Sequence, residues 1–178
     1  MQTKNRGRLF LVGGGIVAAL FLVAVGIGAI VMGMKGRNEV RDALAQEHIV
    51  GTQDSTIPGE AVDTGDEARA FADVMRKHTL EATGGQTYSE IPRYLDANGK
   101  PTNDAAAAAK NADGKSIENP LRQLWVTETA LTTSLNTAYF AENVGNFAIF
   151  MGIALLFSGI GFGVLTLGVL RHQGEMQA

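Results

Sequence analysis

Two long uncharged stretches dominate the pattern of hydrophobic and polar positions along this chain. The first runs from Leu9 to Met34 and the second from Val144 to Leu170, and neither contains Asp, Glu, Lys or Arg. A hydrocarbon core about 30 Å thick needs roughly 20 helical residues, and only a helix satisfies its own backbone groups in lipid. The core helix of a soluble protein normally keeps a polar stripe, which both stretches lack. The sequence therefore predicts transmembrane helices at 9–34 and 144–170.

Basic residues predict how the chain is threaded through the membrane. Lys4, Arg6 and Arg8 precede the first stretch, and Arg171 follows the second. Three basic residues just after the first stretch oppose this bias, but a segment as long as the one between the spans translocates largely regardless of charge. The first stretch exceeds the apolar region of a signal peptide, so we expect it to remain as an anchor. We expect a plasma-membrane protein with an extracytoplasmic domain at 35–143 and short cytoplasmic tails at 1–8 and 171–178.

The segment between the two spans carries helix signals at both of its ends. Val40, Leu44 and Ile49 fall near one helical face with no proline among them, which predicts a helical stalk over about 35–50. Asn119 followed by Pro120 is a typical helix start, so a second stalk is predicted over 120–143. The predicted fold class is an all-α membrane protein, in which two transmembrane helices extend into a small, mostly helical extracytoplasmic domain.

The insert at 51–119, between the stalks, has a thin predicted core. Thr64-Gly65-Asp66-Glu67 fits a capping box, and the helix that it starts should end near Gly84-Gly85. Asn103-Asp104 precedes a run of five Ala, whose high helix propensity favours a further helix. Leu, Ile, Val and Phe are scarce over 52–118, so we expect the insert to pack on the stalks, on a second copy or on another subunit.

Two sets of mostly apolar positions recur every seven residues along the second stalk, and Glu128 is their one charged member. One set is Leu124, Leu131 and Ala138, and the other is Leu121, Glu128 and Leu135. Such spacing indicates a helix that packs along a partner helix. An ordinary amphipathic helix that covers the small domain fits the same positions, and the sequence leaves both interpretations open.

Small residues four positions apart recur in both predicted spans. Small side chains let helix backbones approach closely, which drives helix association where lipid is as apolar as leucine. Because glycine is common in membrane helices, composition alone is the alternative explanation. We predict helix–helix contacts here, with the other span, another copy or a different protein as the partner. The candidate packing residues are the pairs Ala24 and Gly28, Ala29 and Gly33, Ala154 and Ser158, and Gly159 and Gly163.

The chain offers little for a chemical reaction. It has no Cys and three His, and neither span contains His or an ionisable residue that could bind haem or copper or form an ion path. Asp96-Ala97-Asn98-Gly99 and Asn111-Ala112-Asp113-Gly114 match only fragments of a calcium loop and are predicted to be turns. His78 has no nucleophile beside it in the sequence. We therefore expect no cofactor, metal or catalytic residue. Because the net charge is −3, we also expect no nucleic-acid partner.

Four motifs that follow one another between the spans carry a resemblance to a known family. They are Val40-Arg41-Asp42-x-Leu44, Asp66-x-Ala68-Arg69-Ala70-x-Ala72-Asp73, Gly85-x-Thr87-Tyr88-x-Glu90, and Glu128-x-x-Leu131-x-x-x-Leu135-Asn136-x-Ala138-Tyr139. With these motifs, the chain resembles a family of actinobacterial two-span membrane proteins of unassigned function, often mislabelled as dioxygenases. The resemblance covers most of the chain. It implies similarity to accessory subunits found with the actinobacterial cytochrome bc–cytochrome oxidase supercomplex, and it implies no functional residues.

These observations favour a non-catalytic accessory or assembly subunit of a larger plasma-membrane complex, with the respiratory supercomplex as the leading candidate. Its expected partners are the lipid bilayer and either other integral membrane subunits or further copies of itself. One alternative is an extracytoplasmic sensor or receptor hairpin that acts through a cytoplasmic signalling partner. Two others are an enzyme that uses paired carboxylates of the extracytoplasmic domain and a purely scaffolding homo-oligomer.

Overall fold

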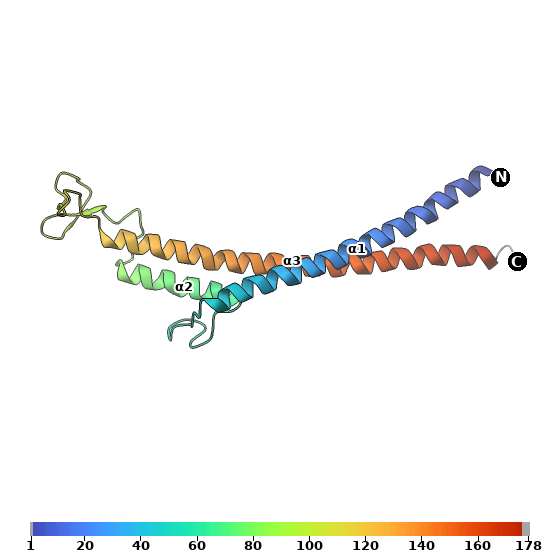
Figure 1. Cartoon of the computed structure of the whole chain (residues 1–178), viewed down its shortest axis with the longest axis horizontal. Helices are drawn as coiled ribbons and strands as arrows, with labels where there is room; N and C mark the ends of the chain where they lie inside the picture. The colour runs from blue at the N-terminus through green and yellow to red at the C-terminus, as the bar shows by residue number, and fades with distance from the viewer. Residues whose placement is uncertain (1, 176–178) are drawn as a thin grey trace. The chain divides into compact units, whose positions relative to one another are not determined.

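The computed structural model describes the backbone of residues 2–175 and the side chains of residues 10–168. Its elements are α1 (Gln2–Gln46), α2 (Gly65–Ala82), β1 (Tyr94–Leu95), β2 (Pro101–Thr102) and α3 (Pro120–Glu175) (Figure 1). The side chains of the predicted cytoplasmic tails, 1–8 and 171–178, lie outside the described residues. The chain divides into two compact units. We call Met1–Glu39 with Ala141–Ala178 the apolar unit, and Val40–Phe140 the polar unit.

The apolar unit consists of two helical segments that are long and apolar enough to cross a membrane. In the most apolar window of α1, and likewise of α3, only 11 % of the residues are buried. The core helix of a soluble protein is mostly buried, whereas these helices expose large side chains such as Phe21, Phe150 and Phe157. The two segments are therefore those of a two-span membrane protein, as the uncharged stretches predict.

Helix α2 begins and ends where the sequence predicts. The Thr64 hydroxyl accepts a hydrogen bond from the Glu67 amide at 3.4 Å, and the Glu67 carboxylate accepts one from the Thr64 amide at 2.8 Å, which completes the capping box. At the other end, Gly84 and Gly85 have φ values of +63° and +81°. A residue with a Cβ atom rarely adopts this conformation, so the pair of glycines lets the chain leave the helix.

The segment between α2 and α3 differs from the all-α prediction. β1 and β2 pair antiparallel with Tyr94 opposite Thr102, and further single bridges connect this segment to itself. The predicted helix over the five-Ala run is wrong, because these residues form turns and a bridge. The Asp104 carboxylate accepts a hydrogen bond from the Ala106 amide and holds a local turn instead. A run of five residues is too short to be a stable helix unless it packs on a neighbour.

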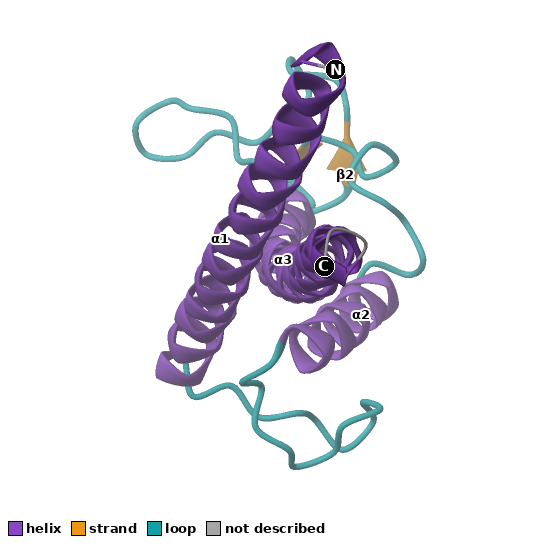
Figure 2. Cartoon of the chain, turned by 90° about the vertical axis from the view of Figure 1, so that its right-hand side faces the viewer, coloured by secondary structure: helices purple, strands orange, loops and turns teal. Residues whose placement is uncertain are grey.

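The core of the polar unit lies where α2 and the end of α1 meet α3. In both views α2 runs alongside the first part of α3 (Figures 1 and 2). The buried cluster contains mostly small or branched side chains, and Val40, Ile49 and Ala138 pack against it. Its members come from all three helices and from the loop before α2: Leu44, Val62, Ala68, Ala72 and Leu135. The expected packing of the insert on the stalks is therefore seen within this unit.

The two seven-residue repeats along α3 differ in burial within the polar unit. Glu128 and Leu135 are buried, whereas Leu124 and Leu131 are 37 % and 47 % exposed. The inward repeat therefore fits the interpretation of an amphipathic helix over the small domain. Leu124 and Leu131 of the other repeat are not covered by the described part of this chain, whereas its third member, Ala138, packs against the core cluster.

Candidate functional site

A seam of small residues joins the two helices of the apolar unit. On α1 the seam contains Ala19, Gly26 and Gly33, and on α3 it contains Gly145, Gly152 and Gly159. Within each helix these residues are seven positions apart. A spacing of seven is slightly less than two turns of a straight helix, so a seam that keeps it requires the helices to wind around each other with a left hand.

The contacts across this seam are reciprocal and pair the helices antiparallel. A Cβ atom placed on Gly26 would lie 2.7 Å from the carbonyl oxygen of Gly152, and one on Gly152 would lie 2.6 Å from that of Gly26. Gly33 and Gly145 are related in the same way, at 2.6 Å and 3.0 Å. Real Cβ atoms do not approach an oxygen within 3 Å. The two backbones are therefore close enough that Gly26, Gly33 and Gly152 cannot carry any side chain without moving a helix.

The eight predicted packing residues divide between this seam and the open surface of the apolar unit. Gly33 and Gly159 belong to the seam, and a Cβ atom on Gly163 would make ordinary contact with Ala19 at 3.8 Å. Ala29 is half-buried. The other four predicted residues are exposed: Ala24, Gly28, Ala154 and Ser158. Among the described residues, nothing lies within 4 Å of the Cβ position of Gly28.

Pairs four apart were therefore an incomplete signal for the seam. Ala19, Gly26, Gly145 and Gly152 take part in it but do not belong to the predicted pairs. The spacing of seven repeats on both helices of the seam, but Ala154, Gly161 and Gly168 share this spacing on the open surface, so the spacing alone does not identify the seam residues. Ser158 is exposed and donates a hydrogen bond to the Ala154 carbonyl of its own helix at 2.8 Å, so its polar group is satisfied locally.

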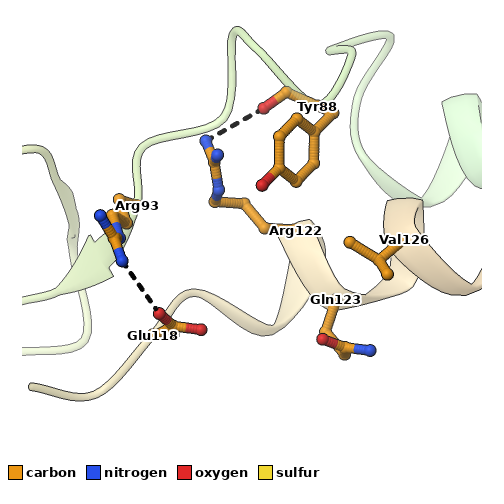
Figure 3. A pocket seen from close by; sticks show the side chains of 6 residues that line it. All are labelled: Tyr88, Arg93, Glu118, Arg122, Gln123 and Val126. Atoms are coloured by element: carbon orange, nitrogen blue, oxygen red, sulfur yellow. Dashed lines mark hydrogen bonds and ion pairs between the residues drawn. The ribbon is translucent and has the colours of Figure 1, made fainter.

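One surface feature of the polar unit is built around Tyr88 and the start of α3. Arg122 donates hydrogen bonds from Nη1 to the carbonyls of Tyr88, at 3.1 Å, and Ile91, at 2.8 Å. Its guanidinium also lies 3.9 Å from the centre of the Tyr88 ring (Figure 3). Trp125, one turn further along α3, donates its indole N–H to the Gln86 carbonyl at 2.9 Å. The segment after α2 is thus fastened to α3 by side chains that α3 supplies.

Two hollows adjoin on this surface and share Tyr88 and Val126. The first has a volume of about 270 Å³ and is lined mostly by polar and charged side chains, including Arg93 and Arg122 (Figure 3). Arg93 also lies 3.6 Å from the carboxylate of Glu118. The second is a more open groove of about 530 Å³ along the exposed face of α3, lined by Tyr88, Trp125, Val126, Thr129, Ala130 and Thr133. We call them the arginine pocket and the apolar groove.

A second polar cluster ties the loop before α2 to that helix. One oxygen of Asp54 accepts hydrogen bonds from Lys77 at 2.9 Å and from His78 at 2.8 Å. The other oxygen accepts a hydrogen bond from Thr52. Hydrogen bonds from Lys77, His78 and Thr52 hold the pKa of Asp54 far below its usual value, and the Asp54 hydrogen bond raises the pKa of Lys77. His78 therefore has a structural partner in Asp54, and both side chains are 42 % exposed.

The turns that match fragments of calcium loops are closed by their own side chains. Oδ1 of Asp96 accepts hydrogen bonds from the amides of Asn98 and Lys100, and Oδ1 of Asn111 accepts hydrogen bonds from the amides of Asp113 and Lys115. These residues therefore form turns, as predicted. Across the described residues, no group of three or more His, Asp or Glu side chains is placed to hold a metal ion.

Comparisons of this chain with models of protein families, with curated proteins and with solved structures find no match. The function of this chain must therefore be inferred from its own residues and geometry.

Proposed function

We propose that this chain is a non-catalytic accessory or assembly subunit of a larger plasma-membrane complex. The leading candidate is the actinobacterial cytochrome bc–cytochrome oxidase supercomplex, which the sequence motifs imply by resemblance. In this proposal the apolar unit holds the chain in the bilayer with both tails in the cytoplasm, and the polar unit is displayed on the outer side.

The observation that carries the proposal is a second set of small residues, on the open surface of the apolar unit. Gly14, Gly28 and Gly161 have nothing within 4 Å of their Cβ positions among the described residues, and Ala24, Ala154 and Ser158 are exposed. The seam between the two helices already uses other glycines. A partner helix could approach these outward positions as closely as the two helices approach each other.

The outward face of α3 in the polar unit supports the same proposal. Between Gln123 and Ala141 the only charged residue is Glu128, and its side chain is buried. A helix face in water normally carries charged residues. An uncharged face with exposed Leu124 and Leu131 is typical of a surface that another protein covers.

Purification of a tagged chain from native membranes in mild detergent, followed by mass spectrometry, tests the proposal. We expect respiratory subunits to co-purify at fixed stoichiometry. The variant Gly28→Leu should reduce their recovery, because it adds bulk to the open surface without touching the seam. Val31→Leu, at a neighbouring exposed position, is the matched control and should leave recovery unchanged. Recovery of the tagged chain alone, with unchanged respiration after deletion of the gene, would contradict the proposal.

The arginine pocket favours a second candidate, a sensor or receptor hairpin that acts through a cytoplasmic signalling partner. Such a protein needs a ligand site in the polar unit, and the pocket with its adjoining groove offers a hollow surface for one. Co-purification of a signalling protein in place of respiratory subunits would favour this candidate.

A further inference from the structure

The arginine pocket and the apolar groove form one surface with two chemical ends. They share Tyr88 and Val126, so a single ligand can extend from one into the other. Together their volumes fall within the range of about 300–1,000 Å³ typical of small-molecule sites. The chemistry of each end therefore defines half of the ligand.

The polar end carries an excess of positive charge. Arg93 and Arg122 line it, and Glu118 is the one acidic residue among its lining side chains. Arg122 is held in place by two backbone carbonyls and by the Tyr88 ring, so it needs little reorganisation to meet a ligand. Guanidinium groups match the planar geometry of carboxylates and the oxygens of phosphates, which makes this end suited to a single anionic group.

The apolar end is a groove without any charged lining residue. Val126, Ala130 and the methyl groups of Thr129 and Thr133 are one turn apart along α3. Trp125 also lines the groove, with 3 % of its surface exposed and its indole N–H already satisfied by the Gln86 carbonyl. This end offers contact area and no hydrogen-bond donor from the indole, which suits a hydrocarbon chain.

We propose that this surface binds a linear amphiphile with one anionic head group. Its carboxylate or phosphate lies against Arg93 and Arg122, and its acyl or alkyl chain lies along Val126, Ala130 and Thr133. A free fatty acid and a phosphate monoester can each supply such a ligand, and the shared chemistry is an anion joined to a hydrocarbon chain. The binding surface does not depend on the proposed function.

Fluorescence of Trp125 can report this binding directly, because the chain contains a single tryptophan. The full chain, reconstituted in phosphatidylcholine vesicles, is titrated with 11-bromoundecanoate, whose bromine quenches indole only at short range. We expect saturable quenching. A bromoalkyl phosphate of equal length tests the second source, and the tighter of the two binders identifies the preferred head group. The corresponding bromoalkyl alcohol should quench at least tenfold more weakly. Equal quenching by the alcohol, or no saturable quenching by either anion, would overturn the proposal.

Two variants with matched controls test each end of the ligand. Arg93→Gln should weaken the apparent affinity by about tenfold, since it removes one charge-assisted hydrogen bond, whereas Lys100→Gln, at an exposed lysine outside the pocket, should not. Val126→Asp should abolish quenching, whereas Thr127→Asp, at the next and also exposed position, should not. Circular dichroism should show unchanged helix content in all four variants. If the variants of the lining residues bind as tightly as their controls, the ligand lies elsewhere and the proposal fails.

Discussion

The two units of this chain build their interiors in opposite ways. In the apolar unit the helices meet where side chains are missing, at Gly26 against Gly152 and Gly33 against Gly145. In the polar unit the interior consists of a few large side chains, such as Ile91 and Trp125, together with small ones on α2. Lipid provides no hydrophobic drive for two apolar helices to associate, so contact there depends on how closely the backbones approach. In water, the removal of apolar surface supplies the drive, and large side chains supply most of that surface.

The two units therefore tolerate opposite kinds of substitution. Extra volume should damage the seam of the apolar unit, and lost volume should damage the core of the polar unit. Three substitutions and a change of pH test this contrast, in order of decreasing expected effect.

Ile91→Ala should have the largest effect. Ile91 is 1 % exposed, so truncation leaves a cavity and should lower the free energy of unfolding of the polar unit by about 2–5 kcal/mol. Pulse proteolysis of the full chain in detergent along a urea series measures this. Ile117→Ala, at an isoleucine that is 40 % exposed, is the control and should cost much less. Equal midpoints for the two variants would show that Ile91 does not belong to a stabilising core.

Gly26→Val should separate the helices of the apolar unit, at a cost near the upper end of the about 1–3 kcal/mol typical of overpacking. The reporter is a disulfide between Ala19→Cys and Gly163→Cys, whose Cβ atoms would be 3.8 Å apart, within the range for such a bond. The chain has no cysteine of its own, so alkylation and mass spectrometry report this pair alone. We expect near-complete oxidation in the parent and a marked loss with Gly26→Val. Gly28→Val, where nothing described lies nearby, should retain the parent yield.

Thr64→Ala should have a smaller effect, confined to the polar unit. It removes the hydroxyl that caps α2 and should lower the free energy of unfolding by about 1 kcal/mol. The same proteolysis assay measures the shift, with Thr127→Ala at an exposed position of α3 as the control. A loss of disulfide yield in the Ala19–Gly163 reporter would contradict the expectation that the cap acts on the polar unit alone.

Acid should have the smallest effect on this contrast, and it too should act on the polar unit. Burial raises the pKa of Glu67, but hydrogen bonds from Asp63 and Thr64 outweigh this effect, so the pKa lies below 4.5. A hydrogen bond from the amide of Thr87 likewise lowers the pKa of Glu90. A carboxyl whose pKa is lower in the folded state stabilises that state above its unfolded pKa and loses this contribution as the pH falls. We therefore expect the urea concentration at the proteolysis midpoint to decrease once the pH is lowered below about 4.5. Glu67→Gln should reduce this dependence without abolishing it, because Glu90 and Asp54 keep their lowered pKa values, and an unchanged slope would contradict the assignment to the capping box.

The sequence predicts well those elements whose signals are local. The uncharged stretches, the capping box at Thr64 and the Asn119-Pro120 start each depend on residues within one or two turns, and α2 and α3 begin where these signals place them. The five-Ala run misleads because helix propensity alone cannot stabilise a helix of only five residues. The Asp104 carboxylate also offers this segment a local turn as an alternative.

The surface around Tyr88 could not be predicted in the same way. It joins Tyr88 and Arg93 from the segment after α2 to Arg122 and Val126 on α3, and no local pattern indicates that these segments meet. The seam is an intermediate case. Its spacing of seven is visible in each span, but which face of one helix meets which face of the other depends on the pairing of Gly26 with Gly152.

The interlocking of backbone against backbone has a consequence for movement. Each carbonyl that rests on an opposing glycine blocks sliding along the axis until the next small residue arrives, seven positions or about 10 Å later. Intermediate displacements would drive bulky neighbours such as Val23 and Leu156 into the opposing main chain. We therefore expect the two helices of the apolar unit to move together as one rigid body or to separate. They should not slide gradually past each other along their axes.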